Sequence, residues 1–429
     1  MDFLRTNTSV KAESFQQTSV FEHGVNEILS RSGPIPIIEF VHTCIEEAHA
    51  LRASDIHIDP YEQDVVIRLR IDGVLQDKCV FSKAILPEVI SRIKVLSGLR
   101  TDEHQAAQDG RFRLITNANA GTPIDIRVSI TPTYYGENAV LRLLADHASH
   151  FTLEMLGFGE ADREKIERAI AQPYGMILAT GPTGSGKTTS LYTLIKILNT
   201  KDVSIITIED PIEYAVPGIT QIQINHRSNL TFAQGLRSIL RQDPNIIMVG
   251  EVRDAETAGI AVNTALTGHL LLSTLHTNDS ATTLPRLLDM GIDAYLVAST
   301  VNIAIGQRLV RKVCKHCSKA HELTEAERNN LMRILPERLK KHANAIPNTF
   351  YKGKGCTACD STGFSGRIGI YEVLVVSPKV REAILERESS VVIKNIAISE
   401  GMTTMFEDGL IKATEGKTTL AEVLRTINE

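Results

Sequence analysis

The sequence predicts an α/β protein in which a small α+β domain precedes a larger domain built on a parallel sheet. Short apolar strands alternate with helical stretches through the second half of the chain, an order typical of parallel α/β sheets. A glycine-rich loop lies between one such strand and its helix, and two Cys-x2-Cys pairs follow further on. With 429 residues, the chain is long enough for about three units of domain size.

The composition excludes several classes of protein without identifying an activity. The net charge of −5, the 5% aromatic residues and the absence of Trp argue against a general electrostatic or base-stacking grip on nucleic acid. Six cysteines are too few for a disulfide scaffold. The longest apolar stretches, 256–275 and 294–310, are interrupted by polar and charged residues, and residues 1–33 contain no signal-peptide core. The composition therefore predicts a cytosolic, multidomain protein.

Hydrophobic periodicity predicts the elements of the first domain. Residues 1–35 sustain no periodicity, so we expect a flexible tail there, followed by an α+β domain over 36–150. Two alternating strands flank a turn at Asp72-Gly73, the first of them over 65–71. The expected helices lie at 37–51 and 84–96, and the other expected strands at 111–115, 124–130 and 138–144.

The second domain is predicted over 151–429. Its expected strands lie at 175–180, 203–208, 246–249 and 269–274, and its expected helices at 160–172, 187–198, 231–241 and 254–267. After about residue 311 the strand pattern ends, and the C-terminal region 367–429 is expected to be helical. Residues 311–359 contain 11 Lys and Arg against four Glu, a local charge of +7. Such a segment fits either an anionic membrane surface or a solvated metal-binding subdomain.

The glycine-rich loop matches the phosphate-binding pattern G-x-x-x-x-G-K-[ST] in full. Its backbone N–H groups can surround phosphate oxygens, and the helix that follows adds the positive end of its dipole. Lys187 should reach the β- and γ-phosphates of a nucleotide, and Thr188 should hold Mg²⁺. The alternative, a plain glycine-rich turn, is disfavoured because a strand and a helix flank the loop correctly. The residues expected to bind nucleotide here are Gly181, Pro182, Thr183, Gly184, Ser185, Gly186, Lys187, Thr188 and Thr189.

Acidic residues and one histidine follow three of the other strands. Glu251 ends the strand 246–249 and is suited to polarising an attacking water or to binding Mg²⁺. Because ligands of open α/β sheets bind at the carboxyl ends of the strands, at least one of Glu209, Asp210 and Glu213 is expected in the same site. His276 lies where a γ-phosphate sensor would lie. The alternatives are a solvated acidic turn and a structural histidine.

Arginines are clustered around the same strands. Their planar guanidinium groups suit bidentate phosphate contacts and charge stabilisation in phosphoryl transfer, although most surface arginines have no special role. The arginines of the second domain that we expect to bind nucleotide are Arg237, Arg241, Arg253 and Arg286. Those of the first domain that attract attention are Arg68, Arg70, Arg127 and Arg142.

Four cysteines form the pattern C-x2-C…C-x2-C, with 38 residues between the pairs. Four thiolates suit tetrahedral Zn²⁺, and the pattern offers no open coordination position, so a structural zinc site is predicted. The ligands are Cys314, Cys317, Cys356 and Cys359, within a subdomain over 311–366. A redox pair or inert cysteines are the alternatives. Cys44 and Cys79 are isolated and are expected in a hydrophobic core.

Together these segments resemble the type II secretion and type IV pilus assembly ATPases. Besides the phosphate-binding loop and the four cysteines, the resemblance depends on segments spread over about 36–429. They are Ala53–Pro60, Arg68–Gly73, Thr207–Tyr214, Leu240–Pro244, Val249–Asp254 and Leu272–Asn278.

The resemblance implies a RecA-like P-loop NTPase core preceded by a PAS-like α+β domain. It also implies a homohexamer that binds ATP, Mg²⁺ and Zn²⁺, lies in the cytoplasm at the inner membrane, and drives an inner-membrane platform protein among other machinery components. Membrane association would be peripheral, through these partners, with no specific nucleic acid bound. The residues implied in catalysis are Lys187, Glu213, Glu251 and His276, together with Arg127 and Arg142 from the first domain.

Several readings stay open within this resemblance. A pilus-retraction ATPase is disfavoured because that branch generally lacks the four cysteines. A nucleic-acid translocase is disfavoured by the acidic charge, and a non-hydrolysing scaffold by the intact Lys187, Thr188 and Glu251. Secretion and pilus extension are not separated. Fuller members carry a further N-terminal domain that docks onto a membrane partner, so recruitment here is expected either to differ or to need residues outside this sequence.

Overall fold

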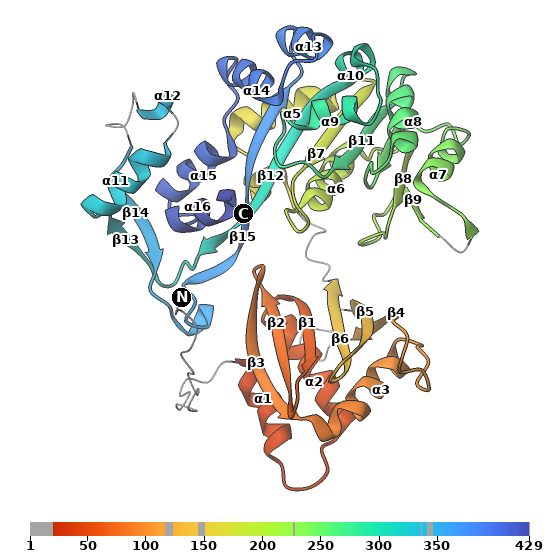
Figure 1. Ribbon diagram of the computed structural model, residues 1–429, viewed down its shortest axis with the longest axis vertical. Helices are drawn as coiled ribbons and strands as arrows, with labels where there is room; N and C mark the ends of the chain where they lie inside the picture. Colours follow the sequence, from red (N-terminus) through yellow and green to blue (C-terminus); the bar gives the residue numbers. More distant parts are fainter. Residues whose placement is uncertain are drawn as a thin grey trace, which may run out of the picture. The chain divides into compact units, whose positions relative to one another are not determined.

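The computed structural model describes residues 20–115, 123–144, 151–225, 228–335, 337–340 and 346–428. The chain divides into two compact units, Met1–Ala145 and Asp146–Glu429, and each is described by itself (Figure 1). The domain boundary predicted at residue 150 lies outside the described residues.

The first unit is a six-stranded antiparallel sheet with helices on one face (Figure 1). The strand order is β3-β2-β1-β6-β5-β4. The strands are β1 Ala53–Pro60, β2 Asp64–Ile71, β3 Val74–Ser82, β4 Gln108–Ile115, β5 Pro123–Thr133 and β6 Gly136–Leu144. The helices are α1 Val20–Ser30, α2 Ile37–Ala50, the 3-10 turn η1 Lys83–Ile85 and α3 Leu86–Leu96. Alternate residues of each strand join the helices in one core, which leaves the other face of the sheet to polar side chains.

The expected helices and strands of this unit are present, with two differences. The predicted tail over 1–35 is wrong for residues 20–30, which form α1 and bury Val25 and Ile28 against the core; residues 1–19 lie outside the described part of the chain. Strand β1 was not predicted, because its buried Ile56 and Ile58 alternate with polar residues over too short a run. Cys44 and Cys79 are buried in this core, as expected.

The second unit is a seven-stranded sheet in the order β15-β12-β7-β11-β10-β8-β9, with helices on both faces (Figure 1). All neighbours are parallel except β12 and β15. The strands are β7 Gly175–Thr180, β8 Ile205–Glu209, β9 Thr220–Gln223, β10 Ile246–Val249, β11 Leu270–Leu275, β12 Val301–Val313 and β15 Phe364–Val375. The central four are fully buried, as parallel strands covered on both faces are.

Two hydrophobic cores cover the faces of this sheet. One face packs on α5 Glu160–Ile170 and α6 Lys187–Leu198, with α4 Leu153–Leu156 nearby. The helices that pack on the other face are α7 Phe232–Ile239, α8 Ala255–Leu266, α9 Thr283–Asp289, α10 Ala294–Thr300, α13 Pro378–Leu385 and α14 Ser390–Ser399.

The prediction that the strand pattern ends near residue 311 is wrong. β15 pairs antiparallel with β12 along almost its whole length, so the region 367–429 begins in a strand and only then becomes helical. Gly306 of β12 lies opposite Thr180, the last residue of β7. The seven residues of β12 beyond this point extend about 20 Å past the end of β7.

We call the antiparallel pair of β12 and β15 the β12–β15 hairpin. The cysteine-bearing segment connects these two strands and forms a small subdomain at their end. It contains the two-stranded sheet β13 Ser318–Glu322 and β14 Thr349–Gly353, with α11 Glu325–Ile334, α12 Glu337–Lys340 and the 3-10 turn η5 Thr357–Cys359. Leu331 and Phe350 share a hydrophobic core with α15 Met405–Thr414 and α16 Leu420–Asn428. No helix in the described part of the chain has the length and apolar character needed to cross a bilayer.

Helix α1 is expected to contribute to the stability of the first unit. Ile28 is 2% exposed in the shared core, so Ile28→Ala should lower the free energy of unfolding by about 2–4 kcal/mol. Ile38→Ala is the matched control, because that side chain is 64% exposed and should cost close to nothing. Urea unfolding monitored by circular dichroism measures both, and equal effects would contradict the packing of α1.

Candidate functional site

The parallel register brings the carboxyl ends of four strands to one edge of the second sheet. Thr180 lies opposite Leu275, and Val249 lies between Ser273 and Ile208. Side-chain hydrogen bonds tie these ends together. The Ser273 hydroxyl donates to the Val249 carbonyl at 2.7 Å, and the Thr277 N–H donates to Thr180 Oγ1 at 3.1 Å. The loops that follow the strands are therefore held at fixed spacing, as an active-site edge requires.

The phosphate-binding loop connects β7 to α6, which begins at Lys187 as predicted. Gly181, Gly184 and Gly186 all have positive φ, between 79° and 145°, which residues with a Cβ rarely adopt. A Cβ on Gly181 would lie 2.3 Å from the Gln307 carbonyl oxygen. Pro182, Thr183 and Gly184 form the exposed tip, and Thr188 and Thr189 are half-buried in the first turn of α6.

Lys187 is enclosed by its own loop. Its Nζ donates hydrogen bonds to the carbonyls of Gly181 at 2.7 Å and Pro182 at 3.0 Å. Burial lowers the pKa of Lys187, and the charge of Glu251 opposes this shift. The lysine and the carboxylate are therefore close enough to interact electrostatically across the strand ends.

Gln307 is hydrogen-bonded to the phosphate-binding loop, a role that was not predicted from the sequence. It lies on β12, is 1% exposed, and donates from Nε2 to the Ser185 carbonyl at 2.8 Å. A glutamine in the middle of the apolar stretch 301–310 was the available signal, because buried amides are expected to have hydrogen-bond partners.

Glu251 is the central acid of the site. It follows β10 after Gly250, and its side chain is only 11% exposed. Oε1 accepts a hydrogen bond from Arg253 at 2.5 Å, and Oε2 lies 3.1 Å from Nε2 of His276. His276 follows β11 and is about half exposed. Glu251, Arg253 and His276 therefore form a cluster beside Lys187, with the histidine and arginine on the solvent side.

The three acids after β8 have different surroundings. Glu209 is 2% exposed and accepts hydrogen bonds from Thr207 at 2.6 Å, from Gln221 at 3.2 Å and from the hydroxyl of Tyr192 on α6. Burial raises the pKa of Glu209, and these hydrogen bonds oppose that shift. Asp210 is exposed and Glu213 half-buried. Glu209 thus links β8 to α6, whereas Asp210 lies close enough to Arg253 to raise its pKa.

The other predicted arginines of this unit make contacts of another kind. Arg237 pairs with Glu256 of α8 at 2.8 Å. Arg241 donates to the Arg237 carbonyl at 2.9 Å and to the Ser238 hydroxyl at 3.0 Å. Arg286 is exposed on α9. Of the four predicted arginines of this unit, Arg253 is the one with a contact to Glu251 among the described residues.

The arginines of the first unit lie in one row across its sheet. Arg70, Asp55, Arg142, Arg127 and Arg111 are successive cross-strand partners, so their side chains share a face. Asp55 is 4% exposed and accepts a hydrogen bond from Arg142 Nε at 2.9 Å. Arg68, on the same strand as Arg70, pairs instead with Asp59 at 2.6 Å.

The four cysteines meet at the end of the β12–β15 hairpin. Their Sγ atoms all lie within 4.8 Å of one another, and three of the separations are 3.6–3.8 Å. Four sulfurs at about 2.3 Å from one tetrahedral ion would be about 3.8 Å apart, whereas a disulfide needs about 2.05 Å. The Gly363 N–H donates to Cys359 Sγ at 3.2 Å, which favours a thiolate there. The donor set therefore fits a single closed tetrahedral metal site.

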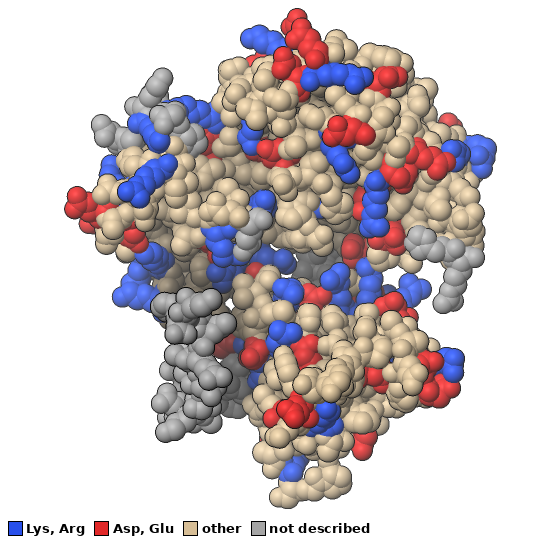
Figure 2. Space-filling view, viewed as in Figure 1, with Lys and Arg blue, Asp and Glu red and all other residues tan. Residues whose placement is uncertain are grey.

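Charge over this subdomain is mixed despite its excess of Lys and Arg. Lys352 lies 2.9 Å from Glu327, and Arg338 pairs with Glu407 of α15. On the face shown in Figure 2, basic and acidic side chains are interspersed over α11, β13 and β14. The positive charge is thus partly paired within the protein.

Comparison with known proteins agrees with the geometry of the site. The family model described as "Type II/IV secretion system protein" matches residues 30–425. The type IV pilus assembly ATPase PilB of Thermus thermophilus is 46% identical over 394 residues, which are 91% of this chain and 43% of that protein. Type II secretion system protein E of Xanthomonas campestris pv. campestris is 46% identical over 396 residues, 92% of this chain and 68% of that one. The chain spans less than half the length of the Thermus relative.

A solved structure shows the same fold. The Legionella pneumophila ATPase DotB superposes with a TM-score of 0.63 at 24% identity, covering 90% of this chain and 94% of that chain. The strand-end site and this fold define a P-loop ATPase. The chain belongs to the type II/IV secretion system protein family, the family of the type II secretion and type IV pilus assembly ATPases.

The support from Gln307 should be measurable in nucleotide binding. Gln307→Leu removes the donor to the Ser185 carbonyl, so we expect a loss of about 1 kcal/mol, or about fivefold weaker binding of ATP. Gln172→Leu is the control, because Gln172 contacts the end of α5 and should leave affinity unchanged. Equal affinities of both variants, measured by fluorescence titration, would contradict a role of Gln307 in shaping the loop.

Proposed function

We propose that the chain is the ATP-hydrolysing subunit of a motor that powers assembly of pilin or pseudopilin fibres, in type II secretion or type IV pilus extension. The observation that carries this proposal is the meeting of Lys187, Glu251 and His276 at one sheet edge in a chain of this family. The Thermus pilus ATPase and the Xanthomonas secretion protein are equally similar to it, at 46% identity, so either branch fits.

The residues of the strand-end site divide the work of ATP hydrolysis. The loop amides and Lys187 would hold and neutralise the phosphates, and Thr188 would hold Mg²⁺, which adds positive charge beside them. Glu251 would orient the attacking water and accept its proton, with His276 beside it to respond to the γ-phosphate. Glu209 is engaged with Tyr192 and Thr207, and Asp210 lies close to Arg253, so we assign the roles near the nucleotide to Asp210 and Glu213.

The arginine row supports a role for the first unit in the same reaction. Arg142, Arg127 and Arg111 place three cationic side chains on one face of the sheet, an arrangement suited to binding an anion. We assign the nucleotide phosphates as this anion, reached by Arg127 and Arg142. A homohexameric ring with a PAS-like first domain and a RecA-like ATPase domain is the assembly that family membership favours.

The other proposed partners follow from family membership as well. An inner-membrane platform protein would receive the movement, and the chain would act at the cytoplasmic side of that membrane through its partners. A retraction motor is the second candidate, and the four-cysteine subdomain counts against it.

Zinc is the metal that we assign to the four cysteines. An all-thiolate tetrahedral set suits Zn²⁺ and leaves no position open for catalysis, so the ion would stabilise the subdomain and its junction with the hairpin. Cys314 directly follows β12, and Gly363 directly precedes β15. A metal here would therefore hold the two strands of the hairpin together at their end.

Glu251→Gln tests the proposed chemistry. Loss of the general base should lower the rate of ATP hydrolysis by at least about a hundredfold, while binding of ATP stays within about threefold of the wild type. Glu164→Gln, on the exposed side of α5, is the control and should hydrolyse ATP normally. Unchanged turnover in Glu251→Gln, with ATP still bound, would show that another group activates the water.

Metal analysis of the purified chain tests the zinc assignment. We expect about one zinc per chain, and Cys317→Ser should lose it and unfold at a lower temperature. Cys79→Ala should keep its zinc, because Cys79 lies in the core of the other unit. The assignment would be refuted if the wild-type chain contained no metal and its melting temperature did not change when a chelator was added.

A further inference from the structure

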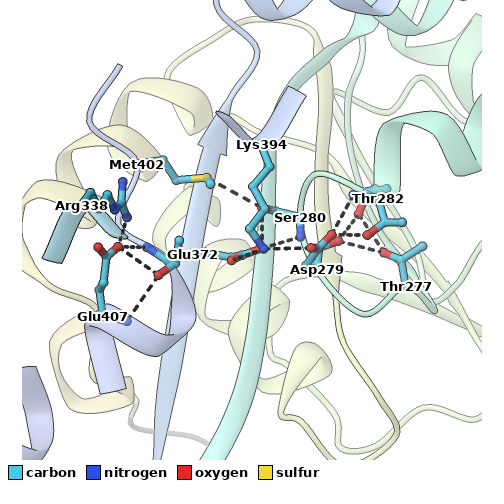
Figure 3. A network of polar contacts seen from close by, with 11 residues as sticks. Thr277, Asp279, Ser280, Thr282, Arg338, Glu372, Lys394, Met402 and Glu407 are labelled. Atoms are coloured by element: carbon cyan, nitrogen blue, oxygen red, sulfur yellow. Dashed lines mark hydrogen bonds and ion pairs between the residues drawn. The ribbon is translucent and has the colours of Figure 1, made fainter. Parts of the chain in front are cut away.

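A network of buried and half-buried polar side chains joins the segment after His276 to the C-terminal helices (Figure 3). Glu372 of β15 is 1% exposed and accepts hydrogen bonds from the Ser280 N–H and hydroxyl, both at 2.8 Å. Nζ of Lys394, on α14, lies 2.9 Å from Asp279 Oδ2 and 3.5 Å from Glu372 Oε2. Lys394 therefore bridges two carboxylates that come from different parts of the fold.

Asp279 transmits this contact to the catalytic edge. Its carboxylate accepts from the Thr282 N–H at 2.8 Å and from the Thr282 hydroxyl, so it shapes the loop. Its backbone carbonyl accepts from the Thr277 hydroxyl at 3.2 Å, and Thr277 is bonded in turn to Thr180 at the end of β7. The chain of contacts from α14 to β7 thus passes within three residues of His276.

The approach of Glu372 to this loop depends on a glycine. A Cβ on Gly306 would lie 2.8 Å from Glu372 Cγ and 3.0 Å from the Ser280 backbone nitrogen. Gly306 is also the residue of β12 that pairs with Thr180. The backbone is therefore built to let the carboxylate reach the loop next to the phosphate-binding strand.

The Lys394–Asp279 pair is charged at neutral pH. Burial disfavours the charged lysine, but the charge of Glu372 and the hydrogen bond to Asp279 raise the pKa of Lys394. Burial also acts against the charged Asp279, and hydrogen bonds from Thr282 and Lys394 lower its pKa nevertheless. Without the lysine, the buried Glu372 and the half-buried Asp279 would be two neighbouring carboxylates with their cation removed, so the loop would move to separate them.

We propose that Lys394 is a positioning residue for ATP hydrolysis, which acts through Asp279 to fix the loop that places His276 beside Glu251. The inference rests on the roles proposed above for those two residues. Lys394 lies far from the nucleotide-binding segments in the sequence. Its effect would be on the position of His276, and a displacement of about 1 Å in a catalytic group is enough to lower the rate. Substrate affinity, which depends on the phosphate-binding loop, should be spared.

The experiment compares kcat with ATP affinity in the 429-residue chain. Lys394→Met should lower kcat about tenfold while the Kd for ATP changes less than about twofold, and Lys394→Arg should keep kcat within about threefold. The matched control is Lys352→Met. Lys352, on β14, lies 2.9 Å from both Glu327 and His321, so it tests the loss of a lysine that bridges two side chains away from the 277–282 loop. Its kcat should stay within about twofold.

Two outcomes would overturn the proposal. One is an equal loss of kcat in Lys394→Met and Lys352→Met; the other is weaker ATP binding at unchanged kcat. If Lys394→Met does not fold, Asp279→Asn decides, because it keeps the acceptor for Thr282 and loses only the ion pair; its kcat must fall at unchanged Kd. Normal turnover of Glu251→Gln, measured in parallel, would refute the role proposed for Glu251, whereas normal turnover of Lys394→Met alone would refute only this inference.

Discussion

The antiparallel pairing of β12 with β15 is the interaction on which the second unit depends. It completes the sheet beside β7, and its register determines what lies under the phosphate-binding loop. Gly306 pairs with Glu372, and the next residue, Gln307, reaches Ser185. The far end of the same pair carries the cysteines. One long hairpin therefore supports the phosphate site, the network at Lys394 and the metal site together.

The chemistry at the strand ends depends on a rigid apolar interior and a thin polar edge. The central strands bury every side chain on both faces, which leaves the sheet little freedom to shift. At the edge, the hydroxyls of Ser273 and Thr274 donate to the carbonyls of Val249 and Gly250. The loops that follow these strands are therefore held at the distance that separates the strands. Glu251 and His276 belong to different loops and still meet at 3.1 Å for this reason.

Local patterns predicted much of this protein. The strand at 175–180, the helix from Lys187 and the phosphate-binding loop follow from periodicity and glycine placement, because these signals lie within a few residues of one another. The pairing of β12 with β15 could not be predicted in that way. About 50 residues separate the two strands, and that segment forms helices and a two-stranded sheet of its own. Pairing between distant strands is decided by tertiary packing.

The site was predictable in its residue types more than in its contacts. Glu251 and His276 were identified because each follows an apolar strand. Glu209 also lies at the end of an apolar strand, but its side chain is buried and hydrogen-bonded to Tyr192. The position of a residue on a strand does not determine which partners its side chain finds. Lys394 carries no sequence signal, because its partners come from segments far away in the chain.

The position of the cysteines has a consequence for how the chain folds. Pairing of β15 with β12 closes a loop of about 50 residues, and closing a long flexible loop costs chain entropy. Cys314 and Cys317 lie at one end of the insertion, and Cys356 and Cys359 lie at the other. A metal bound there brings the two strands to the distance at which hydrogen bonding begins. The ion would thus offset part of the entropy cost of pairing β15 with β12, rather than act in the chemistry of the finished enzyme.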